Sequence, residues 1–542
     1  IMAFGYNPFI ASWSPYHGSA YAVIEAAAKV VAAGARYDKM RYSYQEYFER
    51  MNSEESWGKT LSALLGALKM QVELGLPSIG GKDSMSGTFQ NINVPPMLMA
   101  FGITTVDART VISPEFKKAG NKLFFIKHTP LNNFMPDTEA LKENFSFVSS
   151  AIEQGKIISA YAVGFGGIVE AVSKMSFGNK VGATISMDEQ ALFNYAYGSI
   201  VVEATEELEF PAAELIGETI ANEEVIFNGV SFGIDSLQKI NAEKFCQIYP
   251  DRGIEGGSTR KSEPEKKEFK YQGEAVAQPV AYFPVFAGTN CDYDTSKAFE
   301  RAGAKITTSV FCDLTAEDIF ASIEKMKKMI DECHIFVLSG GFSAGDEPDG
   351  SGKFIASVLN NATVTKAVHA LIERGGLILG ICNGFQALVK SGLLPYGKLG
   401  MMTVESPTLF HNDIHRHISQ IVSTRVGTTA SPWLSSFQVG DLHSIAVSHG
   451  EGKFVVSEEM AEELFANGQV AFQYADMEGN ATTDAPHNPN GSSYGIEGII
   501  SKNGQILGKM GHTERYDDYL FKNIAGEKRQ NIFANAVAYF TK

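Results

Sequence analysis

Three stretches of the sequence carry side chains that could act together in nucleophilic catalysis, and the first contains a cysteine. Residues 377–386 read Leu-Ile-Leu-Gly-Ile-Cys-Asn-Gly-Phe-Gln, an apolar run followed by a cysteine with a glycine two positions to either side. This pattern predicts a buried strand, a tight turn that holds Cys382, and a helix. Free backbone N–H groups at a helix start favour a thiolate and can also bind an oxyanion. Cys382 is therefore a candidate nucleophile; the alternative is a buried cysteine that ends a core strand.

The second stretch supplies a candidate base and a group to orient it. A strand predicted at 505–509 runs into Met510-Gly-His-Thr-Glu-Arg515, which places His512 and Glu514 at the end of that strand. Residues two apart point to the same side of an extended chain, so the Glu514 carboxylate can reach the far ring nitrogen of His512. A thiol nucleophile needs such a base to take its proton and to protonate a leaving amine. Taken alone, a surface histidine beside an acidic residue is the more ordinary explanation.

The third stretch is a glycine-rich loop after a predicted buried strand. Residues 338–346 read Leu-Ser-Gly-Gly-Phe-Ser-Ala-Gly-Asp. The backbone N–H of Gly341, together with that of Asn383, could bind the oxyanion of a tetrahedral intermediate. An ordinary tight turn is the alternative for this loop. The coincidence of three such stretches at strand ends favours a shared site.

The elements that must position these residues lie in the second half of the chain, where predicted strands alternate with predicted helices. The strands lie at 280–286, 335–338, 377–379, 445–447 and 470–472, and the helices include 296–302 and 316–331. Such alternation indicates a doubly wound, mostly parallel sheet with a site at the carboxyl ends of its strands. Cys382 follows one of those ends.

Taken together, these motifs resemble the class I glutamine amidotransferase domain of the large, single-chain formylglycinamidine ribonucleotide synthases of purine biosynthesis. The motifs are Gly-Ile-Cys-Asn-Gly-Phe-Gln at 380–386, Gly-Gly-Phe-Ser-Ala-Gly-Asp at 340–346, Val-Ser-His-Gly-Glu-Gly-Lys-Phe at 447–454 and Gly-His-Thr-Glu-Arg at 511–515. The segments 472–474 and 488–492 resemble the same family. The resemblance covers nearly the whole chain but only about half of a large synthase.

The resemblance implies a role for each residue of the candidate site. Cys382 would attack the side-chain amide of glutamine, release ammonia and leave a glutamyl thioester that water hydrolyses. His512 would be the base, with Glu514 to orient it, and Gln386 would contact the bound glutamine. Where the family usually has a proline between the histidine and the glutamate, this chain has Thr513, which affects the rigidity of the turn rather than the chemistry.

The first 250 residues resemble the second aminoimidazole ribonucleotide synthetase-like half of the same synthases. The expected fold class is therefore α/β and α+β multidomain. Its expected parts are a small subdomain at 1–115, a larger one at 116–250, a charged linker at 251–277 and the amidotransferase domain at 278–542. Within the small subdomain we predict helices at 19–33 and 58–74, the second with apolar residues at helical spacing.

A short segment of this half, Gly80-Gly-Lys-Asp-Ser84, is the candidate for binding ATP or substrate. It is not a Walker P-loop, because residue 76 is leucine and residue 83 is aspartate. In relatives Gly81 would approach nucleotide phosphate and Ser84 the substrate, while Lys82 would face a phosphate or be solvated. The resemblance implies ATP and magnesium as cofactors of the intact enzyme and formylglycinamide ribonucleotide as its acceptor substrate.

The expected metal ligands of this half are altered. Large relatives hold magnesium and an auxiliary nucleotide with a Glu-x-x-x-Asn helix and a His-Asp-x-Ser-Asp-Gly-Gly bend. Here Glu25 is followed by Lys29, and the bend reads Tyr161-Ala-Val-Gly-Phe-Gly-Gly167. An ammonium group would lie where a cation should bind, and hard oxygen ligands are missing. Glu25 remains as a candidate ligand of a degenerate site, and we expect no auxiliary nucleotide–magnesium complex there.

Composition excludes some other classes of protein. A formal charge of −16 on 542 residues argues against general binding to nucleic acid or to acidic membranes. No apolar run reaches the roughly 18 residues of a membrane span, and five cysteines without a CxxC pair favour neither disulfides nor a thiolate zinc site. We expect a cytoplasmic protein. The start Ile1-Met2-Ala3 suggests a fragment whose partner is the missing N-terminal half of the polypeptide.

Two other hypotheses about the function of the chain remain open. A Cys/His/Glu set on a doubly wound sheet could also serve a cysteine peptidase or amidase. The altered front half could belong to a regulatory module without catalytic activity. The stretch 410–417 adds His411, His415 and His417, which could bind a metal but also resembles a family segment near the glutaminase site.

Overall fold

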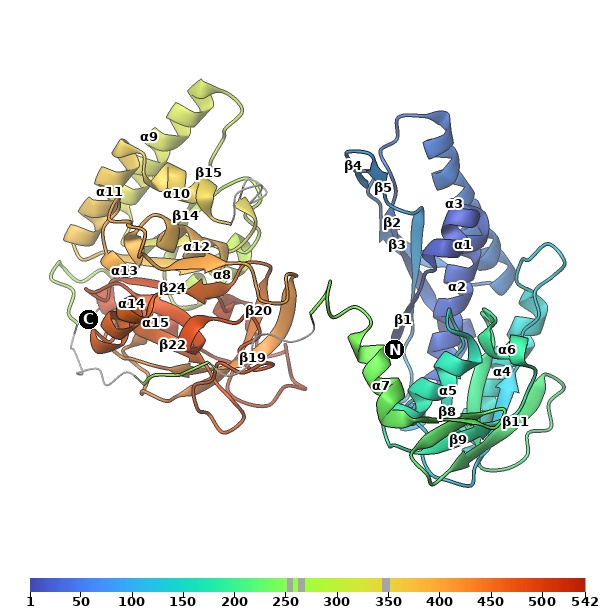
Figure 1. Ribbon diagram of the computed structural model, residues 1–542. Coiled ribbons are helices and arrows are strands. Elements are labelled where there is room, and N and C mark those ends of the chain that lie inside the picture. The colour runs from blue at the N-terminus through green and yellow to red at the C-terminus, as the bar shows by residue number, and fades with distance from the viewer. Residues whose placement is uncertain (251–256, 262–268, 344–350, 542) are drawn as a thin grey trace. The chain divides into compact units, whose positions relative to one another are not determined.

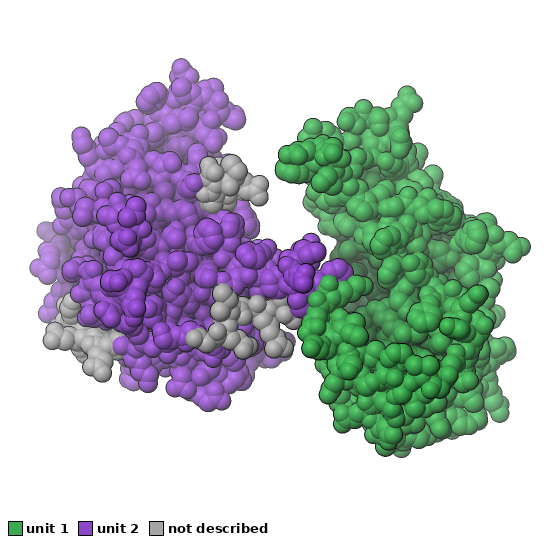
Figure 2. Space-filling view, viewed as in Figure 1, with its two compact units in different colours: residues 1–244 green, residues 245–542 purple. Residues whose placement is uncertain are grey.

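The computed structural model describes residues 1–250, 257–261, 269–343 and 351–541. These residues form two compact units, Ile1–Lys244 and Phe245–Lys542 (Figure 2). Parts of the predicted linker, and residues 344–346 of the glycine-rich loop, lie outside the described residues. In the described part of the chain, no helix has both the length and the apolar character that a membrane crossing requires.

The first unit, blue to green in Figure 1, begins with a four-stranded sheet whose strand order is β1-β6-β2-β3. Its strands are β1 (Met2–Gly5), β6 (Met97–Ile103), β2 (Arg41–Tyr47) and β3 (Ser78–Lys82), and a separate hairpin is formed by β4 (Thr88–Phe89) and β5 (Ile92–Asn93). Strands β2 and β3 are parallel, whereas β6 is antiparallel to both β1 and β2. The helices are α1 (Pro8–Trp13), α2 (Pro15–Ala32) and α3 (Glu54–Leu74).

Helix α3 confirms the helix predicted at 58–74. The apolar residues at helical spacing, however, do not form its buried face. Its small residues face inward, and a Cβ on Gly66 would lie 2.0 Å from the Tyr16 carbonyl oxygen of α2. The leucines that define the helical spacing are instead exposed, for example Leu61 at 58%. Close helix packing through small residues therefore decides which face is buried.

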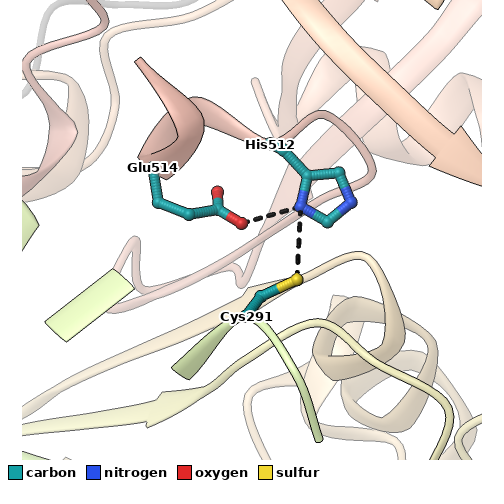
Figure 3. Close-up of side chains that lie close together, drawn as sticks. All are labelled: Cys291, His512 and Glu514. Carbon is teal, nitrogen blue, oxygen red and sulfur yellow. Dashed lines mark hydrogen bonds and ion pairs between the residues drawn. The ribbon is translucent and has the colours of Figure 1, made fainter. Parts of the chain in front are cut away.

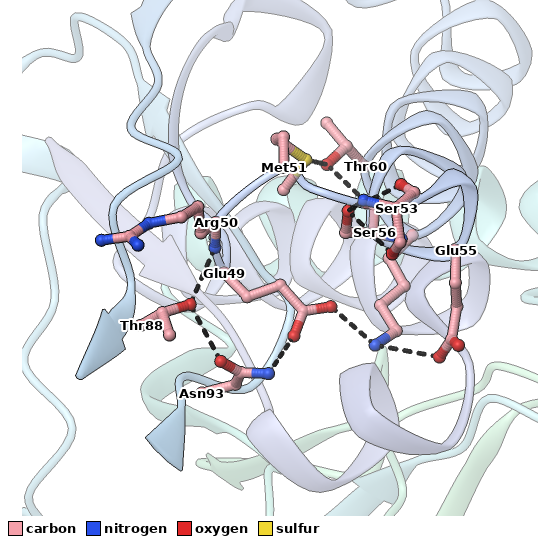
Figure 4. A network of polar contacts seen from close by, with 10 residues as sticks. Glu49, Arg50, Met51, Ser53, Glu55, Ser56, Thr60, Thr88 and Asn93 are labelled. Carbon is pink, nitrogen blue, oxygen red and sulfur yellow. Dashed lines mark hydrogen bonds and ion pairs between the residues drawn. The ribbon is translucent and has the colours of Figure 1, made fainter. Parts of the chain in front are cut away.

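A polar network anchors the start of α3 to the β4–β5 hairpin (Figure 4). Lys59 Nζ lies 2.8 Å from Glu49 Oε1. The Asn93 side-chain amide donates to the other oxygen of Glu49, and Thr88 Oγ1 donates to Asn93 Oδ1 over 2.9 Å. The helix itself begins with a capping box between Ser53 and Ser56, which satisfies backbone N–H groups that a helix start leaves unpaired.

The rest of the first unit is a seven-stranded sheet in the order β13-β12-β9-β11-β7-β10-β8. Its strands are β7 (Lys122–Ile126), β8 (Ile157–Ala162), β9 (Gly182–Ile185), β10 (Ile200–Ala204), β11 (Ala213–Ile220), β12 (Glu224–Phe227) and β13 (Val230–Gly233). Its helices are α4 (Thr138–Glu153), α5 (Gly167–Phe177), α6 (Glu189–Phe193) and α7 (Ile234–Glu243). All neighbouring pairs are antiparallel except β9 and β12.

The second unit is built on a nine-stranded sheet in the order β15-β14-β16-β17-β24-β23-β22-β19-β20. Its strands are β14 (Val280–Val285), β15 (Lys305–Val310), β16 (Ile335–Leu338), β17 (Leu377–Ile381), β19 (Ile418–Val426), β20 (Leu442–His449), β22 (Val470–Tyr474), β23 (Ile496–Ile500) and β24 (Ile506–Lys509), and β18 (Thr408–Phe410) pairs with β21 (Lys453–Val455). Its helices are α8 (Asp292–Arg301), α9 (Ala316–Glu332), α10 (Lys353–Leu359), α11 (Ala362–Glu373), α12 (Asn383–Lys390), α13 (Leu393–Tyr396), α14 (Glu458–Ala466) and α15 (Ile532–Thr541).

The expected α/β fold is present, with one difference in strand direction. Strands β14, β15, β16, β17 and β24 are parallel, as predicted. Strands β20 and β22 occupy the predicted segments 445–447 and 470–472 but run antiparallel to their neighbours. Strand β20 follows β19 without an intervening α-helix, and a parallel pair would need such a crossover.

Candidate active site

The turn after β17 holds Cys382 in a strained conformation. Its φ is 52° and its ψ is −107°, although positive φ is unusual for a residue with a side chain. Such a conformation costs about 1–3 kcal/mol and persists only when its surroundings enforce it. Here a Cβ on Gly384 would lie 1.9 Å from the Leu338 carbonyl oxygen, and the Cys382 N–H donates to the Lys509 carbonyl over 2.9 Å. The turn is therefore clamped between β16 and β24.

The residues after β24 supply the predicted base and its carboxylate. Glu514 Oε1 accepts a hydrogen bond from His512 Nδ1 over 2.7 Å, and both side chains are buried (Figure 3). The His512 backbone N–H donates to the Ala446 carbonyl over 2.8 Å, which ties this segment to β20. With Nδ1 held by Glu514, Nε2 is left to act as the base.

Opposing effects set the pKa of His512. Burial disfavours the imidazolium and lowers the pKa, but the Glu514 carboxylate and the thiols of Cys291 and Cys382 raise it, so that it lies well above the ordinary value. The Cys382 thiol is thus near enough to the imidazole to raise its pKa, and its Sγ lies 3.7 Å from the Ser448 carbonyl oxygen. The structure brings Cys382, His512 and Glu514 together from segments more than 100 residues apart.

The predicted oxyanion-binding groups lie beside this group. Gly341 has φ of 149° and forms a β-bridge with Thr289. A Cβ on its neighbour Gly340 would lie 3.0 Å from His512 Cε1, so the glycine-rich loop runs directly against the imidazole. Asn383 is the first residue of α12. Its side chain donates to Gln386 Oε1 over 3.0 Å, which fixes the start of the helix.

Gln386 is buried and bonded within the protein. Its Oε1 accepts from Asn383, and its Nε2 donates to the Glu451 carbonyl oxygen. The side chain that we expected to contact glutamine therefore connects α12 to the segment after β20. Both polar atoms of the Gln386 side-chain amide are used in these two hydrogen bonds, which position the segment.

Sequence reasoning missed Cys291, the N-cap residue of α8. Its Sγ lies 3.9 Å from His512 Nδ1 (Figure 3). The same sulfur accepts a hydrogen bond from Arg515 Nη2 over 3.1 Å. It was considered only as one of five cysteines. The available signal was the run Gly-Thr-Asn-Cys-Asp at 288–292, directly after β14, another parallel strand that ends at the same edge as β17.

His449 is a second buried group that sequence reasoning did not single out. Asn412 Oδ1 accepts from the Gly452 N–H, and it lies 3.2 Å from His449 Nδ1, which is therefore assigned as the protonated nitrogen. Burial, reinforced by His512 and His417, lowers the pKa of His449 to about 3. His449 is thus neutral, and its Nε2 has no hydrogen-bond partner among the described residues.

The three histidines at 411–417 do not converge on one another as metal ligands. His411 Nδ1 lies 3.6 Å from Glu451 Oε1, and His417 Nε2 lies 2.9 Å from Ser448 Oγ. Among the described residues, one group of three metal-ligating side chains has its ligand atoms within 4.8 Å of one another, and it consists of Cys291, His512 and Glu514.

In the first unit, the candidate nucleotide residues share one exposed segment at the end of β3. Gly81 and Lys82 are exposed, and a Cβ on Gly81 would lie 2.5 Å from the Tyr44 carbonyl oxygen of β2. The Ser84 N–H donates to the Glu46 carbonyl over 3.1 Å, and its hydroxyl lies 2.8 Å from that of Ser86. The structure therefore brings Gly81, Lys82 and Ser84 together only as parts of one local segment.

Glu25 does not fit a divalent cation. Lys29 Nζ lies 2.8 Å from one carboxylate oxygen, and the Tyr6 N–H donates to the other over 2.9 Å. Burial raises the pKa of Glu25, while Lys29 and Tyr6 lower it. The Lys29 ammonium and the Tyr6 N–H engage both carboxylate oxygens, so a cation could bind Glu25 only by displacing one of them.

The sheet and the buried Cys-His-Glu group suit a glutamine amidotransferase or a cysteine peptidase, and the relatives of the chain separate the two. Residues 278–540 match the CobB/CobQ-like glutamine amidotransferase domain. The phosphoribosylformylglycinamidine synthase subunit PurQ of Gloeobacter violaceus is 33% identical over 254 residues, which cover 47% of this chain and 95% of that protein. The corresponding subunit of Methanococcus maripaludis is 34% identical over 275 residues, with 96% of that protein covered. The chain belongs to this family of phosphoribosylformylglycinamidine synthase glutaminase subunits.

Solved structures give a weaker comparison. The structure of PurLQS from Thermotoga maritima includes a chain that is 26% identical, with a TM-score of 0.36 and coverage of 48% of this chain and 99% of that one. PurL of Thermotoga maritima complexed with ATP is 17% identical, with a TM-score of 0.37 and coverage of 51% of this chain and 48% of that one. These TM-scores are too low to support an inference about function.

Proposed function

We propose that the second unit hydrolyses glutamine and that its ammonia serves the synthesis of phosphoribosylformylglycinamidine. The observation that carries this proposal is the buried 2.7 Å contact between His512 and Glu514 beside the strained Cys382 turn. Membership of the PurQ family supports the choice of glutamine as substrate. A Cys-His-Glu group on a doubly wound sheet could also serve a cysteine peptidase or amidase, and the family relationship favours glutamine over a peptide.

The proposed reaction begins when Cys382 passes its proton to His512 and its sulfur attacks the amide carbon of glutamine. The N–H groups of Gly341 and Asn383 stabilise the oxyanion that forms on the amide oxygen. His512 then protonates the leaving nitrogen, and ammonia departs from a glutamyl thioester. Water attacks the thioester as His512 takes its proton, and glutamate leaves as the thiol is restored.

We assign the acceptor chemistry to the wider synthase. Residues 1–250 would form a synthetase-like half in which the segment with Gly81, Lys82 and Ser84 faces nucleotide or substrate. Because Glu25 is neutralised by Lys29, the ATP and magnesium that drive the conversion of formylglycinamide ribonucleotide would bind at a different synthetase half. The present chain would contribute ammonia to that reaction.

The decisive experiment measures glutamate and ammonia released from glutamine by the whole chain. Cys382→Ala removes the nucleophile, and we expect the rate to fall by about a thousandfold or more. Cys333→Ala is the matched control, because Cys333 is also buried in this unit and its Sγ donates a hydrogen bond to the Ile330 carbonyl oxygen. Persistence of the activity in Cys382→Ala, or cleavage of peptides by the native chain, would contradict the proposal.

A further inference from the structure

The group formed by Cys291, His512 and Glu514 has a second chemical capacity. A thiolate sulfur, an imidazole nitrogen and a carboxylate oxygen are the ligands that Zn²⁺ prefers. The Sγ–Nδ1 distance is 3.9 Å and the Nδ1–Oε1 distance is 2.7 Å. Ligand atoms around a tetrahedral zinc ion with bonds of about 2.0–2.3 Å lie roughly 3.3–3.8 Å apart, so side-chain shifts of about 1 Å would suffice.

We propose that Zn²⁺ binds Cys291, His512 and Glu514 and thereby inhibits the glutaminase. The inhibitory part of this inference rests on the proposed function, whereas the metal site itself rests on geometry alone. The steps of the proposed glutaminase reaction do not use Cys291. Because Cys291 lies beside His512, it can bind a metal ion together with the base although it is not the nucleophile.

The inhibition follows from the two nitrogens of His512. In the structure Nδ1 faces both Glu514 and Cys291, which leaves Nε2 for Cys382 (Figure 3). A zinc ion on Nδ1 requires that nitrogen to give up its proton, and the neutral imidazole then carries its proton on Nε2. An Nε2–H cannot accept the proton of Cys382. Binding therefore releases the thiol proton of Cys291, changes the tautomer of His512 and removes the base.

Cys291 also contacts a cationic side chain, which would have to move away from the sulfur when zinc binds. The Arg515 guanidinium donates to Cys291 Sγ over 3.1 Å and offsets negative charge on the sulfur. Zinc would take over that role, and Arg515 Nε has no hydrogen bond to break among the described residues. Asn290 Oδ1 lies 3.0 Å from Cys291 Sγ, and this oxygen could serve as the fourth ligand of the zinc ion.

A cavity borders the Glu514 side of this group. It has a volume of about 300 Å³ and is lined by Glu514, Asp517 and Asp518 among others. Glu514 Oε2 is buried and has no hydrogen-bond partner among the described residues, so the second carboxylate oxygen is unoccupied by protein donors. Asp517 pairs with Arg301 and Asp518 with Arg529, which keeps the cavity polar.

The test titrates the whole chain with Co²⁺, whose bonds to a thiolate give a charge-transfer absorbance, and then displaces it with Zn²⁺. We expect Cys382→Ser to keep the absorbance and Cys291→Ser to weaken Co²⁺ binding by at least tenfold. Cys333→Ser is the control for loss of a buried thiol and should bind as the native chain does. Glutaminase activity should be inhibited by Zn²⁺ in the native chain, and Cys291→Ser should need at least tenfold more Zn²⁺ relative to its own activity.

Loss of the absorbance in Cys382→Ser with retention in Cys291→Ser would overturn the proposal, because the metal would then lie on the nucleophile. Absence of any thiolate absorbance in the native chain would also overturn it. If Cys291→Ser does not fold, Cys291→Ala replaces it, and unchanged absorbance in that variant would overturn the proposal, because the metal would then lie on another of the free thiols. Cys291-dependent Co²⁺ binding in a chain without glutaminase activity would uphold the site and refute the proposed function, so the two failures are distinguishable.

Discussion

Each unit contains a buried glutamate beside a basic side chain, and the two pairs differ in what remains available for chemistry. Glu25 in the first unit accepts from the Lys29 ammonium and from a backbone N–H, so both of its oxygens are occupied. Glu514 in the second unit uses one oxygen to hold His512, and its other oxygen has no partner among the described residues. The Lys29 ammonium, which stays charged at neutral pH, occupies Glu25. The partner of Glu514 is instead an imidazole, which can gain and lose a proton.

The largest effect that tests this comparison is expected from Glu514→Gln. Loss of the carboxylate removes the group that orients His512, and we expect the glutaminase rate to fall by about 10²–10⁴-fold. Because Glu514 raises the pKa of His512, its removal lowers that pKa. His512 accepts the proton of Cys382 only in its neutral form, so activity is lost as the pH falls through this pKa, and the acid limb of the pH–rate profile should move to lower pH.

Asp517→Asn is the matched control for Glu514→Gln. Asp517 is a nearby acidic side chain that pairs with Arg301 over 3.1 Å and does not contact His512. Its replacement should leave the pH–rate profile unchanged. A similar shift in both variants would indicate a general electrostatic effect and would contradict the specific role of Glu514.

The next effect concerns two helical glycines, one in each unit. Gly384→Ala in α12 places a Cβ 1.9 Å from the Leu338 carbonyl oxygen, and we expect a loss of about 1–3 kcal/mol in the free energy of unfolding of the second unit. Gly58→Ala in α3 meets open space and should stabilise the first unit by about 0.5–1 kcal/mol. Thermal unfolding of both variants measures the difference, and equal effects would contradict the clamped turn.

A smaller effect is expected from Lys29→Met in the first unit. Without the ammonium group, the buried Glu25 carboxylate loses the partner that lowers its pKa, so its already raised pKa increases further. A raised carboxyl pKa destabilises the folded state at pH above the unfolded value, and the penalty disappears as the pH falls through the folded value. Because Lys29 is partly exposed, we expect a loss of about 1 kcal/mol at neutral pH and less at pH 5.

The measurement for Lys29→Met is denaturant unfolding of the first unit at both pH values. Lys142→Met provides a matched control, because Lys142 pairs with the exposed Glu139 on a helix surface. The loss in the free energy of unfolding should be a few tenths of a kcal/mol at most, and it should be similar at the two pH values. A larger loss for Lys29→Met at pH 5 than at neutral pH would contradict the assignment.

Much of the candidate site follows from local sequence signals. The glycines at 380 and 384 and the apolar run before them require a tight turn after a buried strand, so the position of Cys382 is a local property. His512 and Glu514 are two residues apart, and their contact needs no long-range information. The helix over 58–74 is equally local, since its spacing defines it even though its leucines are exposed.

Other features depend on contacts that no local pattern encodes. Cys291 lies 221 residues before His512, and only the shared edge of the parallel strands brings its sulfur within 3.9 Å of the imidazole. The antiparallel direction of β20 and β22 depends on the chain turning back after β19. The internal bonds of Gln386 depend in the same way on the segment after β20.

The sequence by itself thus determined the candidate reactive residues and the turns that hold them, because backbone strain and residue spacing act over a few positions. The tertiary structure decided which buried side chains surround the reactive residues and which of their polar atoms remain unpaired. Those properties depend on packing between distant segments. They make Glu25 a closed ion pair and leave Glu514 the partner of a titratable base.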